Sequence, residues 1–91
     1  MKSDYSLTIL YLPKFKRLYR KLPKEIQDLA KIKETIFRKD PFDPKLNTHK
    51  LHGVLKSFWS FYIDPKYRII FEFIDKQTIH FHSVGNHDIY Q

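Results

Sequence analysis

The spacing of apolar positions in the first half of the chain predicts one strand and two helices. Residues 6–12 are apolar and β-prone, which predicts a strand that ends at Pro13. From Pro13 to Leu22 apolar residues recur at helical spacing, with basic residues between them. Pro23 ends this first helix and can open a second one, which the same spacing extends to about Lys39.

In the second half of the chain the apolar spacing changes to the alternation that is typical of strands. The change follows a proline-rich connection at 40–44. The breaks between the later apolar runs are short enough for antiparallel hairpins. We expect strands at about 50–55, 58–64, 67–74 and 78–85. The order β-α-α-β-β-β-β predicts an α+β fold, with an N-terminal helical hairpin on one face of a mainly antiparallel sheet and the other face free for ligands.

Size and composition predict one domain and exclude several kinds of chemistry. Residues 1–91, of which 42% are hydrophobic, suffice for a single core. The absence of cysteine excludes disulfides, thiolate zinc sites and cysteine nucleophiles. The chain has no apolar run of membrane-spanning length and does not begin like a secretory signal. We therefore expect a cytoplasmic protein without a membrane partner.

The chain is strongly basic, and its positive charges are grouped. Seventeen Lys and Arg against ten Asp and Glu give a net charge of +7, which suits a polyanion or an acidic protein as partner. No acidic residue lies between Asp43 and Asp64, and a second acid-free run extends from Lys14 to Lys24. This second run can face RNA or be only the solvated side of a helix. The first run contains Lys45, His49, Lys50, His52 and Lys56. Such grouping favours a charged groove for nucleic acid.

The end of the chain carries the strongest candidates for chemistry. His87 and Tyr90 follow Gly85 closely, where side chains can leave the sheet, and Arg68 lies on the neighbouring predicted strand. An imidazole can exchange a proton near neutral pH, and a guanidinium can bind two phosphate oxygens. The set suits phosphodiester chemistry, with RNA as the expected substrate. Structural alternatives remain open: an Arg68–Glu72 ion pair, a histidine that caps the last strand, and a tyrosine that anchors the tail.

Four segments, in this order and spacing, resemble the RelE/ParE toxin superfamily, in particular its RelE/StbE and YafQ-like branch. They are residues 51–56, 58–60, 67–71 and 84–90. The resemblance implies a toxin of a bacterial type II toxin–antitoxin system. It also implies an endoribonuclease that cleaves mRNA, usually on the ribosome, by attack of the ribose 2′-hydroxyl and without metal or other cofactor. The implied partners are a cognate antitoxin, mRNA and the ribosome. The implied state is a monomer when free and a hetero-oligomer with the antitoxin.

The same resemblance implies roles for particular residues. Arg68 matches a strand arginine that contacts the scissile phosphate, His87 a histidine used for proton transfer, and Tyr90 a terminal aromatic that stacks on or orients the nucleotide. His49, Lys50 and His52 lie where relatives place basic or proton-transferring groups. Any of the three can be the second proton-transfer partner, a charge clamp or part of a solvated edge. The lysines expected to contact RNA are Lys45, Lys50, Lys56 and Lys66.

Two departures from the family pattern leave other functions open. Tyr62 stands where many relatives carry arginine or histidine, and Lys66 stands where YafQ-like members carry an acid. One alternative is a ParE-like toxin that inhibits gyrase and cuts no RNA. Another is a catalytically weakened toxin that acts mainly as an antitoxin or repressor partner. His80 and His82 share a predicted strand face, but no third ligand accompanies them, so no metal site is expected.

Overall fold

The computed structural model describes residues 7–86, so the expected site residues His87 and Tyr90 lie outside the described part of the chain. The described elements are β1 (Thr8–Tyr11), α1 (Pro13–Arg20), α2 (Lys24–Lys39), η1 (Pro44–Leu46), β2 (His49–Lys50), η2 (Gly53–Leu55), β3 (Trp59–Tyr62), β4 (Arg68–Phe73) and β5 (Thr78–Gly85). The η elements are single turns of 3₁₀-helix.

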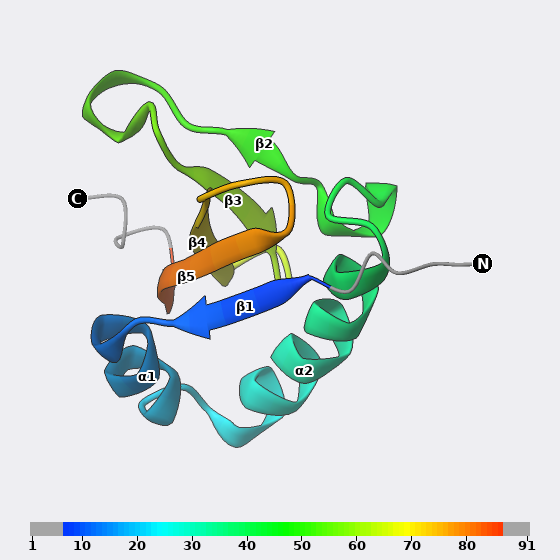
Figure 1. The fold of residues 1–91 in the computed structure, drawn as a ribbon. Helices are drawn as coiled ribbons and strands as arrows, with labels where there is room; N and C mark the ends of the chain where they lie inside the picture. Colours follow the sequence, from blue (N-terminus) through cyan, green and yellow to red (C-terminus); the bar gives the residue numbers. More distant parts are fainter. Residues whose placement is uncertain (1–6, 87–91) are drawn as a thin grey trace.

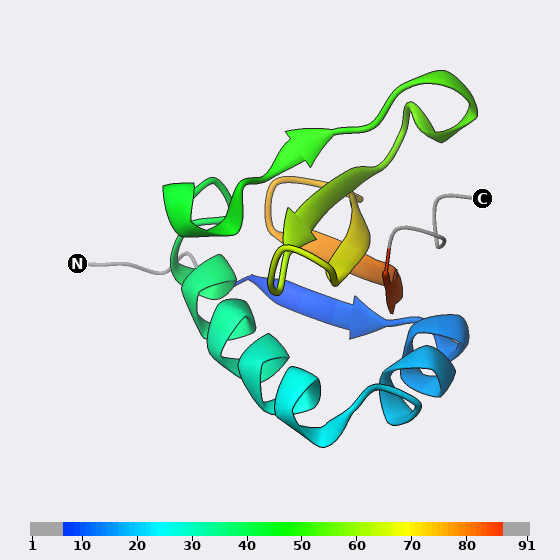
Figure 2. The same ribbon diagram turned by 180° about the vertical axis from the view of Figure 1, so that it is seen from behind.

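The strands form one sheet, and both α-helices cover the same face of it. The strand order is β1-β5-β4-β3-β2, with β1 parallel to β5 and the other neighbours antiparallel. Figures 1 and 2 show α1 and α2 diverging from their short connection beneath the sheet. This two-layer arrangement confirms the predicted α+β class.

The helices begin and end where the sequence predicts, within two residues. Pro13 occupies the first turn of α1, where its missing N–H has no helical partner to lose. α1 ends at Arg20 because the next residues close a turn instead, with the Leu22 N–H donating to the Tyr19 carbonyl. α2 follows Pro23 and ends at Lys39, with basic side chains in its last turn that suit the helix dipole.

The core lies between the sheet and the helices, and aromatic rings dominate it. Phe37 of α2 is fully buried at its centre, stacked on Phe61 with ring centres 4.8 Å apart. Phe71 and Phe81 meet the same ring edge-on, at 4.9 and 5.5 Å. Each such pair contributes about 0.5–1.5 kcal/mol beyond the area it buries. These contacts fix α2 against β3, β4 and β5.

The expected strand at 50–55 is wrong. β2 contains only His49 and Lys50, and the chain then bends through η2. Gly53 has a φ of 70°, a left-handed conformation that a regular strand does not contain. The Phe58 N–H donates to the Leu55 carbonyl, which closes the bend ahead of β3. The apolar alternation in this segment therefore reflects partial burial of a loop and not a strand.

The face of the sheet opposite the helices, called here the outer face, is only partly free. Phe58 reaches across β4 to His82 on β5, with ring centres 4.9 Å apart. Ile70, in the middle of this face, is 2% exposed, and Ser60 is fully buried. The Phe58 ring thus covers part of the outer face, so the expectation of a wholly free face does not hold there.

Candidate functional site

Arg68 lies at the start of β4 against a tyrosine of the neighbouring strand. Tyr62 is its register partner on β3, and the guanidinium carbon lies 4.4 Å from the centre of the tyrosine ring. One terminal nitrogen of the guanidinium donates to the Pro65 carbonyl at 3.0 Å. Arg68 is only 5% exposed. A desolvated cation–π contact contributes up to about 2 kcal/mol, so these partners hold the guanidinium in one orientation.

The turn before β4 explains how the Pro65 carbonyl comes to face Arg68. The Asp64 carboxylate accepts hydrogen bonds from the backbone N–H groups of Lys66 and Tyr67, at 2.8 and 2.6 Å. The Ile63 N–H donates to the Tyr67 carbonyl across the turn. An aspartate followed by proline favours such a side-chain-capped turn. The local sequence therefore places a carbonyl acceptor beside the first residue of β4.

His49 extends this arrangement to a third strand. It pairs in register with Ser60, which places it on the same outer face as Tyr62 two residues later. Its ring meets Tyr62 edge-on, with centres 6.0 Å apart and an interplanar angle of 83°. Its Nδ1 lies 3.0 Å from the Asn47 carbonyl. When Nδ1–H donates there, Nε2 is the nitrogen that accepts a proton from a ligand.

Arg68, Tyr62 and His49 thus form a row across β4, β3 and β2, called here the outer-face row. Sequence reasoning treated Tyr62 only as a departure from the family pattern and missed its central position. In the sequence, its spacing of two residues from Ser60 indicates that both side chains lie on the same face of one strand. Its pairing with Arg68 depends on the register of the sheet, which the sequence does not show. Glu72, the alternative partner of Arg68, lies farther along β4 and pairs in register with His80 of β5.

The expected histidine–arginine pair at the chain end remains a prediction. Gly85 pairs with Arg68 in the β4–β5 register, so the described chain ends just beyond the residue opposite the guanidinium. His87 and Tyr90 lie outside the described residues. What the structure does show is that β5 leads the chain to the same end of the sheet as Arg68.

The cationic residues predicted to bind RNA lie at different places relative to this row. Lys66 is exposed in the turn beside Arg68, with its ammonium 5.6 Å from the Tyr67 ring. His52 and Lys56 are exposed at the two ends of η2, in the bend between β2 and β3.

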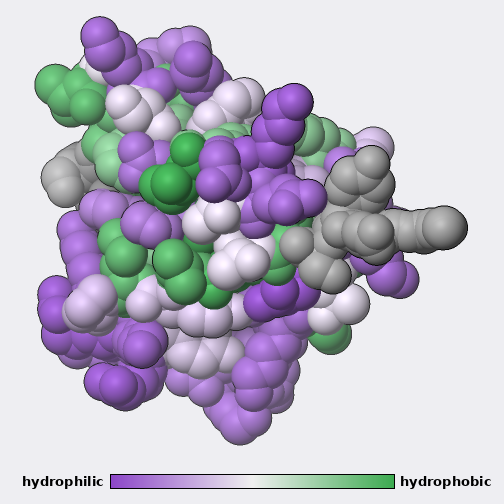
Figure 3. All heavy atoms as spheres, viewed as in Figure 1, coloured by the Kyte–Doolittle hydropathy of each residue, from purple (hydrophilic) through white to green (hydrophobic). Residues whose placement is uncertain are grey.

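Two other cations in this set lie away from the row. Lys50 pairs with Trp59 and points to the opposite face from His49, because successive residues of a strand alternate. Lys45 lies in η1, and its backbone carbonyl accepts a hydrogen bond from the Lys33 ammonium of α2. The second basic run is exposed along α1 and its connection to α2, and hydrophilic side chains gather over α1 in Figure 3.

His82 occupies an irregularity of β5. Phe71 pairs with Phe81 while Ile70 pairs with Ser83, so His82 is the extra residue of a β-bulge. Burial lowers its pKa, and the positive charge of Lys14 lowers it further, against the opposing charge of Glu72. Within residues 7–86 no group of three or more His, Asp or Glu side chains is placed to hold a metal ion.

Comparison with known proteins identifies the family. Residues 7–90 match the family described as bacterial toxin of type II toxin-antitoxin system, YafQ. The chain belongs to the YafQ family. It is therefore a type II toxin of the RelE/ParE superfamily, as its sequence segments predicted. No curated protein sequence matches this chain.

Solved structures share the fold over nearly the whole chain. YafQ from E. coli strain BL21(DE3) aligns with a TM-score of 0.73 and 19% identity, covering 92% of this chain and 97% of that one. A chain of the E. coli DinJ–YafQ toxin–antitoxin complex aligns with a TM-score of 0.74 and 17% identity, covering 92% of this chain and 96% of that one. A chain of the RelBE2 complex from Mycobacterium tuberculosis aligns at 0.70 and 20%, covering 89% and 98%.

Across residues 7–86 no helix combines the length and the apolar character needed to cross a bilayer.

Proposed function

We propose that this toxin is an endoribonuclease that cleaves mRNA in the cytoplasm, on the ribosome, through the outer-face row. The single observation that carries the proposal is the guanidinium of Arg68, fixed against Tyr62 on the sheet face that also carries His49. A fixed cation in surroundings of low dielectric interacts strongly with an incoming phosphate. Family membership supports the same reaction.

In the proposed reaction the 2′-oxygen of a ribose attacks the adjacent phosphorus, and the bond from phosphorus to the 5′-oxygen breaks. The products are a cyclic phosphate and a 5′-hydroxyl. One proton leaves the 2′-hydroxyl and another is delivered to the departing 5′-oxygen. His49 and His87 share these two transfers, and Arg68 stabilises the charge that builds on the phosphate. No step requires a metal ion or cofactor.

The remaining candidates hold the RNA. Lys66 provides positive charge beside the outer-face row, and His52 and Lys56 provide it in the bend between β2 and β3. Lys45 and Lys50 lie away from the row and bind parts of the RNA that extend beyond it. Tyr90 stacks on or orients a nucleotide. Unpaired bases stack on aromatic side chains without regard to sequence, so these groups bind single-stranded message.

The toxin acts as a single domain, residues 1–91, whose partner is a cognate antitoxin. Solved structures that share this fold include toxin–antitoxin complexes, among them DinJ–YafQ and RelBE2. We propose that the free toxin is a monomer and that the antitoxin forms a hetero-oligomer with it and blocks cleavage. The positive charge of the chain suits an acidic inhibitor as well as RNA.

The deciding experiment maps transcript ends by primer extension after brief induction of the toxin in cells. We expect new 5′ ends within coding sequence for the wild type, and their loss together with relief of growth arrest for His87→Ala and for Arg68→Lys. Arg17→Lys is the matched control, because Arg17 is an exposed arginine of α1 outside the row. Thermal unfolding of each purified variant checks that the fold is retained.

Two outcomes would replace this proposal. Intact transcripts with broken chromosomal DNA would identify a gyrase-inhibiting toxin. Harmless expression of the wild type, with antitoxin binding retained, would identify a weakened toxin that serves mainly as a binding partner.

A further inference from the structure

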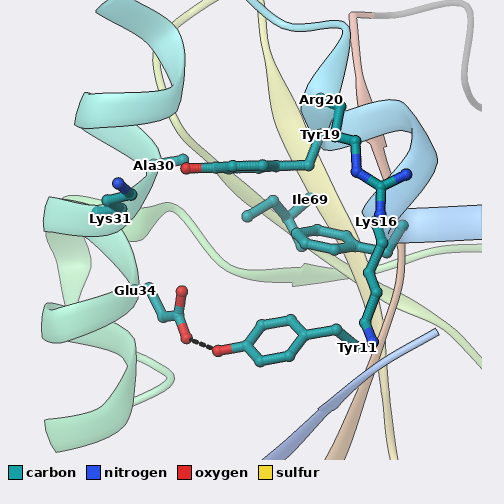
Figure 4. A pocket seen from close by; sticks show the side chains of 9 residues that line it. Tyr11, Lys16, Tyr19, Arg20, Ala30, Lys31, Glu34 and Ile69 are labelled. Atoms are coloured by element: carbon teal, nitrogen blue, oxygen red, sulfur yellow. Dashed lines mark hydrogen bonds between the residues drawn. The ribbon is translucent and has the colours of Figure 1, made fainter. Parts of the chain in front are cut away.

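A cavity of about 310 Å³ lies on the helix side of the sheet, opposite the face that carries the outer-face row. It opens between α1 and α2, with Phe15 and Ile69 at its base. The rings of Tyr11 and Tyr19 project toward α2 on either side of it, as Figure 4 shows. We call this cavity the helix-side pocket. Its volume is at the lower end of ligand sites and suits one or two side chains.

The polar atoms inside the helix-side pocket are already engaged within the protein. The Tyr11 hydroxyl donates to the Glu34 carboxylate, and the Tyr19 hydroxyl donates to the Gln27 carbonyl at 3.0 Å. Glu34 also accepts from Arg38 at 3.2 Å. A nucleobase buried here would find no free hydrogen-bond partner for its polar edges, and burying them unpaired costs free energy. The interior therefore suits an apolar group.

The mouth of the pocket is cationic. Lys16 and Arg20 of α1 and Lys31 of α2 line it and are exposed, whereas its one carboxylate, Glu34, is held by internal hydrogen bonds. An apolar socket with a positive rim is complementary to a bulky apolar side chain flanked by carboxylates. A helix or extended segment of an acidic protein presents such groups together.

We infer that the helix-side pocket anchors an acidic segment of the antitoxin through one bulky apolar side chain. This inference rests on the proposed antitoxin partnership and not on RNA cleavage. Ile69 lines the pocket, and Arg68, its neighbour on β4, points to the opposite face of the sheet. A segment bound in the pocket therefore leaves the outer-face row uncovered. It supplies affinity, while another part of the antitoxin must block the RNA.

The charge of the rim is tested with two matched variants. Arg20→Glu changes a residue that lines the pocket, and Arg17→Glu changes an exposed arginine one turn earlier on the same helix that does not. Both alter the net charge equally. For the cognate antitoxin, calorimetry should give a dissociation constant raised about fivefold to tenfold more by Arg20→Glu than by Arg17→Glu. RNA cleavage by free Arg20→Glu should equal that of the wild type.

The apolar anchor is tested directly by nuclear magnetic resonance. Ala30 and Ile69 are 2% and 1% exposed, and both contribute methyl groups to the pocket. In the complex we expect nuclear Overhauser contacts from an antitoxin side chain to these two methyls. A bound antitoxin without such contacts, or equal losses of affinity in the two variants, overturns the pocket but leaves the partnership intact.

Two further results also decide the matter. If the wild-type toxin forms no complex with this antitoxin, the partnership and the pocket both fail, whereas transcript mapping still judges cleavage independently. If a short single-stranded RNA shifts the Ala30 and Ile69 methyl signals and the antitoxin does not, the pocket binds nucleic acid and the inference is wrong.

Discussion

The guanidinium of Arg68 lies 4.4 Å from the centre of the Tyr62 ring, its register partner on the adjacent strand. A ring face attracts a guanidinium and adds no formal negative charge of its own. Backbone contact with the Pro65 carbonyl fixes the other side of the group. The pair therefore presents a preorganised cation at the end of the sheet where β5 also ends.

If the ring of Tyr62 positions Arg68, removing the ring should slow cleavage and removing only its hydroxyl should not. For Tyr62→Ala we expect a fall in kcat of about tenfold, which corresponds to the loss of about 1–1.4 kcal/mol of cation–π support. Tyr62→Phe should keep kcat close to that of the wild type. Single-turnover cleavage of a short RNA measures both. A large loss in Tyr62→Phe would show that the hydroxyl itself takes part.

Replacing Arg68 by lysine tests the fork of donors separately from the charge. Lysine keeps one positive charge but cannot present two parallel donors to phosphate. We expect Arg68→Lys to lower kcat by about 10²–10³ with a smaller change in KM, as for loss of a preorganised transition-state donor. Unchanged kcat with an unaltered fold would remove Arg68 from the catalytic step.

Burial of His82 should make the free energy of unfolding depend on pH. Its pKa lies below the usual value of about 6.5, mainly because of burial, so the unfolded chain binds a proton more readily than the folded one. The free energy of unfolding therefore falls as pH decreases from about 6.5 toward the folded-state pKa. Above about pH 6.5 the imidazole is neutral in both states, so this loss of stability is absent. In urea titrations between pH 7.5 and 5, the free energy of unfolding should fall less steeply for His82→Gln than for the wild type.

His80→Gln is the control for this pH effect, because it removes a histidine of the same strand away from the bulge. An identical slope in the wild type and in His82→Gln would contradict the assignment. The groups that face His82 are Lys14, Glu72, Phe58 and Ser83.

The hydroxyl of Tyr11 joins β1 to α2. It donates to the Glu34 carboxylate and accepts from Arg38 at 3.2 Å, while Arg38 also donates to the Leu7 carbonyl at 3.2 Å. Tyr11→Phe should reduce the free energy of unfolding by about 0.5–1.5 kcal/mol in urea titrations. Glu34→Gln and the double variant complete a cycle, and strictly additive losses would show that the two side chains are not coupled.

The sequence alone determined most elements and the family. Helical spacing between Pro23 and Lys39 predicts α2 nearly residue for residue, and alternation predicts β5 at 78–85 as observed. Such patterns arise because each helix or strand must bury one side, and that requirement acts over a few neighbouring residues. The ordered segments that resemble RelE/ParE toxins likewise pointed to the family that the comparison confirmed.

Tertiary structure alone decided which side chains meet. The two-residue length of β2, the bulge at His82 and the row of Arg68, Tyr62 and His49 all depend on cross-strand pairing. A pairing register joins residues far apart in the chain, and a single extra residue reverses which face the following side chains occupy. Local patterns do not contain that information. The sequence therefore named Arg68 and His49 as separate candidates, and only the folded sheet placed both beside Tyr62.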